Sequence, residues 1–96
     1  VIEFDKIKIE LNKLVILKND KEFKINNTEK IILEKMINNP GKTFSRENIG
    51  ILINLDKERS IDVIITRLRK KLISDHDHVC LRTIRGKGYM LVSEYD

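Results

Sequence analysis

The sequence predicts an α+β fold in which an N-terminal antiparallel sheet precedes three helices and a C-terminal β-hairpin. Three observations support this: strand-like segments over residues 1–25, helical periodicity over residues 26–72, and two apolar segments flanking a glycine-containing turn over residues 79–93. Ninety-six residues suffice for one domain with a small core. We therefore expect residues 1–96 to form a single domain.

The composition is that of a globular intracellular protein. Hydrophobic residues make up 41% of the chain and charged residues 35%, which predicts a globular rather than a disordered chain. A single cysteine, Cys80, excludes an internal disulfide framework and fits the reducing cytoplasm. No apolar run approaches the roughly 18 residues that span a bilayer, so we expect no membrane partner. No leader peptide is evident, and because the chain opens at Val1 we treat it as a piece of a longer protein.

Four short segments in the first 25 residues are rich in β-branched or aromatic residues. Polar residues separate them, with Asn19-Asp20 as the clearest turn. We expect an antiparallel sheet whose lysines lie on the solvated face. The predicted strands are Ile2–Phe4, Ile7–Ile9, Val15–Leu17 and Phe23–Ile25.

The first helix is predicted from Asn26 to Asn38. Asn26 can cap it, and Glu29 three residues later completes a capping box. Asn39-Pro40-Gly41 ends it, since proline cannot continue the hydrogen-bond ladder. Its predicted apolar face consists of Ile32, Leu33, Met36 and Ile37.

The second helix is predicted from a Ser45 cap to about Ile53. Its inward residues should be Ile49, Leu52 and Ile53. Gly50 weakens a helix by about 1 kcal/mol relative to alanine, so we expect a close helix crossing there. A short polar linker, Asn54–Glu58, leads into the third helix.

The third helix, Arg59–Leu72, has one apolar and one basic face. Ile61, Ile65, Leu68 and Leu72 share a narrow stripe, which predicts the buried side. Cations surrounding a valine suit the DNA major groove, where they meet phosphates and guanine edges while the valine meets a thymine methyl. A basic helix that follows another helix after a brief turn indicates a helix-turn-helix, formed here by the second and third predicted helices. The predicted outer face consists of Arg59, Val63, Thr66, Arg67 and Lys70.

Positive charge is concentrated in one segment of the chain. Between Arg59 and Lys87 there are eight basic and three acidic residues, whereas the net charge of the whole chain is +4. Arginine follows the same distribution, since only Arg46 lies outside this segment. Charge gathered in this way is typical of a polyanion-binding protein.

The predicted hairpin consists of Cys80–Ile84 and Tyr89–Val92. Gly86 and Gly88 allow the tight turn, and Arg85 and Lys87 place two cations at its tip. A basic hairpin beside a helix that lies in the major groove can insert an arginine into the narrow minor groove. Gly86-Lys87-Gly88 lacks the spacing of a nucleotide-binding P-loop.

We expect no catalytic residue, no metal and no cofactor. Asp75, His76, Asp77 and His78 alternate in a short polar loop that does not converge four ligands, so we interpret it as solvated. Cys80 between Val79 and Leu81 is interpreted as a small core residue. No motif places a carboxylate pair or a nucleophile beside a base, which argues against an enzyme.

These segments together resemble the winged helix-turn-helix DNA-binding (effector) domain of OmpR/PhoB-type bacterial response regulators. Arg59-Ser60-Ile61-Asp62-Val63 with Thr66-Arg67-Leu68-Arg69-Lys70-Lys71-Leu72 is similar to the recognition helix of that family. Arg82-Thr83-Ile84-Arg85-Gly86-Lys87-Gly88-Tyr89 is similar to its wing, the C-terminal hairpin. Three other short segments are also similar to sequences of that family: Asn27-Thr28-Glu29, Asn39-Pro40-Gly41-Lys42 and Ser45-Arg46-Glu47. The resemblance therefore covers essentially the whole chain.

The resemblance implies sequence-specific binding of double-stranded DNA to control transcription. Val63 and Arg67 would contact bases, and Arg85 with Lys87 would form the minor-groove wing. The implied phosphate contacts are Arg59, Thr66, Arg69, Lys70, Thr83 and Tyr89. Loss of Arg67 should then lower discrimination between sites, whereas loss of Arg69 should weaken all sequences alike.

The resemblance also implies partners of a longer protein. A sensor kinase would act through a receiver domain that is not present in this chain, and the protein would dimerise on direct repeats. Members of the family often contact RNA polymerase through the loop at Asn54–Glu58, which is shorter here than in most members. Ile64 replaces a polar residue common in the family, so an alternative is a winged-helix protein-interaction module with little or no DNA binding.

Overall fold

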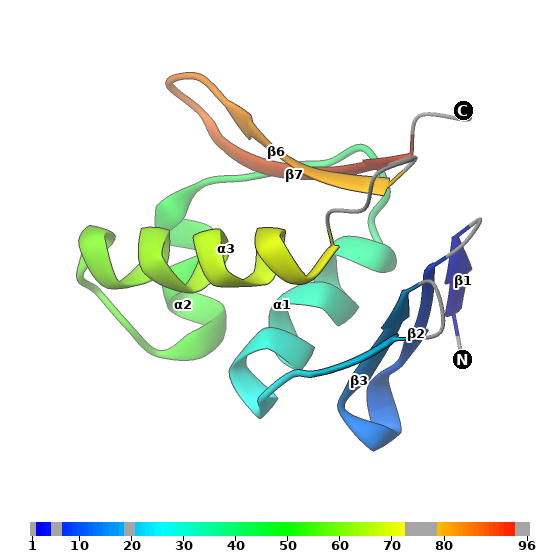
Figure 1. Ribbon diagram of the computed structural model, residues 1–96. Helices are drawn as coiled ribbons and strands as arrows, with labels where there is room; N and C mark the ends of the chain where they lie inside the picture. The colour runs from blue at the N-terminus through cyan, green and yellow to red at the C-terminus, as the bar shows by residue number, and fades with distance from the viewer. Residues whose placement is uncertain (1, 5–6, 19–20, 73–78, 94–96) are drawn as a thin grey trace.

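The described part of the chain forms two antiparallel sheets and three helices (Figure 1). The computed structural model describes residues 2–4, 7–18, 21–72 and 79–93. The sheet, the three helices and the hairpin follow one another in the predicted order, which confirms the α+β fold class. In the described residues, no helix combines the length and the apolar character needed to cross a membrane.

The N-terminal sheet is four-stranded with the strand order β1-β2-β3-β4. Ile9 and Ile16 face each other across β2 and β3, and both are fully buried. The last strand ends one residue earlier than predicted, and Ile25 enters the core directly after it. The strands are β1 (Ile2–Phe4), β2 (Ile7–Glu10), β3 (Val15–Lys18) and β4 (Lys21–Lys24), with a 3-10 turn η1 (Leu11–Lys13) between β2 and β3.

Helix α1 (Asn27–Ile37) begins at the predicted capping box. The backbone N–H of Glu29 donates to Asn26 Oδ1 at 2.8 Å, and that of Asn26 donates to Glu29 Oε1 at 3.0 Å. Both bonds satisfy N–H groups that the first turn leaves free. Of the predicted apolar face, Ile37 at the last turn is only partly buried.

Helix α2 (Arg46–Ile53) is capped by Ser45, and Asn48 completes a second capping box. Ile49 is fully buried, but Leu52 and Ile53 are only half-buried, because the last turn of α2 lies at the surface. A Cβ at Gly50 would lie 2.3 Å from the carbonyl oxygen of Leu55 and 3.2 Å from Ile61 Cδ1. Glycine is therefore needed because the turn after α2 folds back over this helix, as well as for the crossing with the next helix.

Helix α3 (Glu58–Leu72) starts one residue before the predicted Arg59. Its predicted stripe is confirmed, since Ile61, Ile65, Leu68 and Leu72 are each at most 2% exposed. The helix contacts β3 of the N-terminal sheet and β6 (Val79–Ile84) of the second sheet. It thus lies at the centre of the domain, with only its outer face open to solvent.

The second sheet contains a strand that the sequence did not predict. Its order is β5-β7-β6, formed by β5 (Thr43–Phe44), β6 (Val79–Ile84) and β7 (Gly88–Ser93). In Figure 1 the β6–β7 hairpin runs along α3, and its turn extends toward the end of the molecule where α2 leads into α3. One hydrophobic cluster joins Ile16, α1, α2, α3, Phe44 and Leu81.

Candidate nucleic-acid interface

The outer face of α3 carries the predicted side chains, and all of them are exposed. Val63 is 42% exposed, although it is apolar and lies in the middle of the helix. The buried stripe on the opposite side holds the helix against the core, so this face cannot rotate inward. The exposed residues are Arg59, Val63, Thr66, Arg67 and Lys70.

Thr66 differs from the other four because its hydroxyl already donates a hydrogen bond within α3. Thr66 Oγ1 donates to the carbonyl oxygen of Asp62 at 2.8 Å. A phosphate oxygen can only accept, so Thr66 would have to break this bond to donate to DNA. In this conformation the residue offers a methyl group and hydroxyl lone pairs to a ligand.

The tip of the hairpin presents two further exposed cations, Arg85 and Lys87. The backbone N–H of Lys87 donates to the carbonyl oxygen of Ile84 at 2.9 Å and closes the turn. Gly86 has φ 75° and Gly88 has φ 143°, conformations that favour glycine. The predicted roles of both glycines are therefore confirmed, and the turn holds Arg85 and Lys87 at the outer end of the hairpin.

Arg69 and Thr83, two predicted phosphate contacts, are hydrogen-bonded to each other. Arg69 Nη2 donates to Thr83 Oγ1 at 2.6 Å, and Arg69 Nε donates to the carbonyl oxygen of Leu81 at 2.9 Å. The guanidinium carbon of Arg69 also lies 6.0 Å from the centre of the Tyr89 ring. These contacts attach the C-terminal half of α3 to β6.

Tyr89, a third predicted phosphate contact, is 7% exposed. Its hydroxyl donates to Asp62 Oδ1 at 2.5 Å, and Arg46 Nε donates to the same oxygen at 2.8 Å. Asp62 and Arg46 were not predicted as site residues. An acidic side chain in an otherwise basic helix was the available signal, but a sequence does not show which donors it meets.

These bonds shift the pKa values of the groups involved. The hydrogen bonds from Arg46 and then from Tyr89 lower the pKa of Asp62. Burial, reinforced by the neighbouring Asp62 carboxylate, raises the pKa of Tyr89, and the bond to Asp62 raises that of Arg46. At neutral pH, Asp62 is therefore an anion that accepts from a neutral tyrosine and a cationic arginine.

We expect the stabilisation by Asp62 to be lost in the acid range. Its native pKa lies below the ordinary value of 3.8, so its contribution is complete above pH 3.8 and is lost as the pH falls through the native pKa. Asp62→Asn should therefore lower the free energy of unfolding by a constant amount near neutral pH. Denaturant unfolding of both proteins between pH 7 and pH 2 should show this difference shrinking below pH 3.8; a difference independent of pH would contradict the assignment.

A partly buried ion pair fixes the other end of α3. Lys71 Nζ lies 2.7 Å from Glu29 Oε1, and the Glu29 side chain is 3% exposed. The same carboxylate accepts from the backbone of Asn26 in the α1 capping box. Glu29 therefore connects the start of α1 to the end of α3, which contributes to the fixed position of the exposed basic face.

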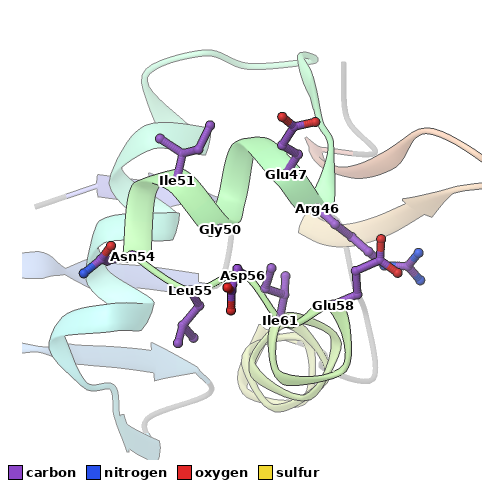
Figure 2. Close-up of a pocket in the computed structure, with 9 residues that line it drawn as sticks. All are labelled: Arg46, Glu47, Gly50, Ile51, Asn54, Leu55, Asp56, Glu58 and Ile61. Carbon is purple, nitrogen blue, oxygen red and sulfur yellow. The ribbon is translucent and has the colours of Figure 1, made fainter.

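A hollow lies beside the turn between α2 and α3 (Figure 2). It has a volume of about 580 Å³ and is lined by both acidic and apolar side chains. Figure 2 views α3 nearly end-on, with α2 crossing above it and the Ile51 side chain extending away from α3. Ile51 is 74% exposed and Leu55 is 40% exposed.

The metal and nucleophile alternatives gain no support from the described residues. No group of three or more potential metal ligands occurs among them. The loop with Asp75, His76, Asp77 and His78 lies outside the described residues, and so does the side chain of Cys80. The interpretations of both stay predictions.

Comparison with known proteins identifies the family. Residues 20–91 match the family described as "Transcriptional regulatory protein, C terminal". The chain belongs to this family. Its members are OmpR/PhoB-type DNA-binding domains, and both this family and the winged-helix fold agree with the resemblance noted in the sequence.

Individual relatives support the same assignment. The chain is 31% identical over 94 residues to the virulence transcriptional regulatory protein PhoP of Salmonella typhi, covering 94% of this chain and 42% of PhoP. It is 26% identical to the DNA-binding domain of the response regulator AdeR, solved in complex with an intercistronic region, with a TM-score of 0.71 and coverage of 95% and 98% of the two chains. The DNA-binding domain of Escherichia coli CadC shares the fold, with 17% identity, coverage of 95% and 90%, and a TM-score of 0.82.

Membership of this family favours the DNA-binding function over the interaction-module alternative. That alternative rested partly on Ile64, which replaces a polar residue. In the structure Ile64 is half-buried and packs against the core cluster. The substitution is therefore explained by packing at the edge of α3 and leaves the exposed basic face intact.

Proposed function

We propose that this OmpR/PhoB-type domain binds double-stranded DNA with α3 in the major groove and the β6–β7 hairpin at the adjacent minor groove. The supporting observation is the row of exposed cations around an exposed Val63 on α3, next to a tip with two more cations. A solvated helix face needs no exposed valine among its charges, whereas a thymine methyl offers it an apolar partner.

The proposed contacts divide into three groups. Val63 and Arg67 read base edges, and Arg85 and Lys87 form the minor-groove wing. Arg59 and Lys70 are exposed cations at the two ends of the helix face and are proposed as phosphate ligands. Phosphate contacts fix the register of the protein on the duplex, whereas base contacts determine the sequence.

Selection of bound fragments from a random duplex library, followed by competition binding, tests this function. We expect one recovered motif, and a slope of log affinity against log salt of about −2 if Arg59 and Lys70 each neutralise a phosphate at about 0.9 per contact. Two half-sites in direct repeat, about 10 bp apart, would indicate how two copies bind. Recovery of random sequences, or binding that is insensitive to salt, would contradict the proposal.

We propose further roles for the longer protein to which this domain corresponds. The chain spans 42% of the length of PhoP, which leaves room in such a protein for a receiver domain and for phosphorylation by a sensor kinase. Dimerisation on direct repeats and a cytoplasmic location would follow from that organisation. The domain itself, residues 1–96, would act by binding and not as an enzyme.

RNA polymerase is the proposed protein partner, and the hollow beside the α2–α3 turn is its proposed contact surface. Ile51 and Leu55 expose apolar surface there, and Glu47 and Glu58 add acidic groups at the edge. Exposed apolar groups next to charged ones are typical of protein-binding surfaces. The hollow lies on the turn between the two helices, so α3 could occupy DNA while this surface stays accessible.

A further inference from the structure

Asp62 is an acidic residue on the helix that is proposed to face a polyanion. It directly precedes Val63, and Arg59 and Thr66 lie one turn away on either side. A carboxylate at this place repels phosphates, so without another role its removal should strengthen DNA binding. The contacts of Asp62 indicate what that role is.

Two donors from different elements converge on one oxygen of Asp62. Tyr89 of β7 donates through its hydroxyl, and Arg46 from the first turn of α2 donates through Nε. Two turns farther along α3, Arg69 donates to Thr83 Oγ1 and to the carbonyl oxygen of Leu81 on β6. The recognition helix is therefore hydrogen-bonded to both strands of the hairpin.

The two attachments meet at one position of the hairpin. Thr83 and Tyr89 are directly opposite each other in the β6–β7 register. Asp62 holds one member of this pair and Arg69 holds the other, so the hairpin is fixed on both strands at the same level. Arg85 lies only two residues beyond Thr83, at the tip. The position of Arg85 relative to Val63 and Arg67 thus depends on these bonds.

We propose that Asp62 and Arg69 are positioning residues that clamp the hairpin to α3. In this arrangement the Tyr89 hydroxyl donates its only proton to Asp62 and acts on DNA affinity by fixing the hairpin, in place of the phosphate contact that the family resemblance implied. Arg69 and Thr83 also fix the hairpin, and both keep N–H or O–H groups that can donate to phosphate. The inference rests on the proposed DNA binding and assigns a positioning role to three of the six residues that the resemblance implied as phosphate ligands.

A double-mutant cycle between Asp62 and Arg85 tests the clamp, with duplex affinity as the readout. If Asp62 were a bystander, Asp62→Ala would raise affinity and leave the effect of Arg85→Ala unchanged. The clamp predicts the opposite sign, with the affinity of Asp62→Ala for the duplex falling roughly fivefold. It also predicts that Arg85→Ala has a smaller effect in the Asp62→Ala background, because substitutions at linked residues are non-additive. Glu58→Gln removes the same charge from an exposed position of the same helix and should not lower affinity.

Tyr89→Phe separates the clamp from direct phosphate binding and from misfolding. Phenylalanine keeps the buried ring and removes only the hydroxyl that donates to Asp62. The clamp predicts that Tyr89→Phe lowers affinity and has no additional effect in the Asp62→Ala protein. Thermal unfolding would verify that each variant is folded at the binding temperature.

Two results would overturn the clamp while leaving the proposed function intact. One is an equal or higher affinity of Asp62→Ala and Tyr89→Phe for the duplex. The other is strict additivity of both variants with Arg85→Ala, which is the outcome for Tyr89 as an independent phosphate ligand. If the wild-type domain binds no duplex even at low salt, the proposed function fails and the clamp fails with it.

Discussion

Gly88→Ala is expected to destabilise the domain by on the order of 3 kcal/mol, because backbone strain and overpacking each cost about 1–3 kcal/mol. Gly88 has φ 143°, and a Cβ there would lie 2.1 Å from the carbonyl oxygen of Phe44. That atom belongs to the backbone of β5 and cannot move aside as a side chain can. Thermal unfolding should show the melting temperature falling by roughly 12–24 °C at about 4–8 °C per kcal/mol.

Gly41→Ala is the matched control for this substitution. Gly41 has φ 77°, so alanine is strained there as well, but a Cβ would meet nothing within 4 Å. Its melting temperature should fall much less than that of Gly88→Ala. Equal decreases for the two variants would show that the close approach of β5 to Gly88 does not contribute.

Arg67→Ala is expected to lower discrimination between matched and scrambled duplexes by about 1–3 kcal/mol, the range for one bidentate base contact. Arg67 is exposed on the outer face of α3, one turn after Val63, and the buried stripe prevents it from turning inward. Competition binding with the selected site and a scrambled site measures the effect. Non-specific affinity should fall much less than specific affinity.

Lys70→Ala is the control for base reading. Lys70 lies on the same face near the end of α3 and is proposed to contact phosphate. Its loss should weaken both duplexes alike and reduce the salt slope by about 0.9. Equal losses on both duplexes for Arg67→Ala would remove Arg67 from the base-reading residues.

The sequence predicted the features that depend on local chemistry and periodicity. Asn26 and Ser45 start helices because their side chains accept from N–H groups that a helix itself leaves free. The stripe from Ile61 to Leu72 predicts which side of α3 is buried, since apolar residues at helical spacing share one face. The outer face of α3 follows from the same periodicity.

Features that depend on long-range contacts could not be predicted in this way. β5 has two residues, too few for a pattern, and it exists because Thr43 and Phe44 pair with Met90 and Tyr89. The sequence placed Asp62 within the predicted third helix but could not show that the hydroxyl of Tyr89, 27 residues later, donates to its carboxylate. The resemblance assigned Tyr89 to phosphate, whereas its low exposure follows only from the packing of the hairpin on α3.

Methylation protection on the selected duplex tests the central claim most directly, since dimethyl sulfate modifies guanine N7 in the major groove and adenine N3 in the minor groove. With wild-type protein we expect protection of guanine N7 within the half-site and of adenine N3 in the adjacent minor groove. Arg67→Ala should lose the first protection and Arg85→Ala the second. Protection that is unaffected by either substitution, or confined to one groove, would contradict the placement of α3 and the hairpin on DNA.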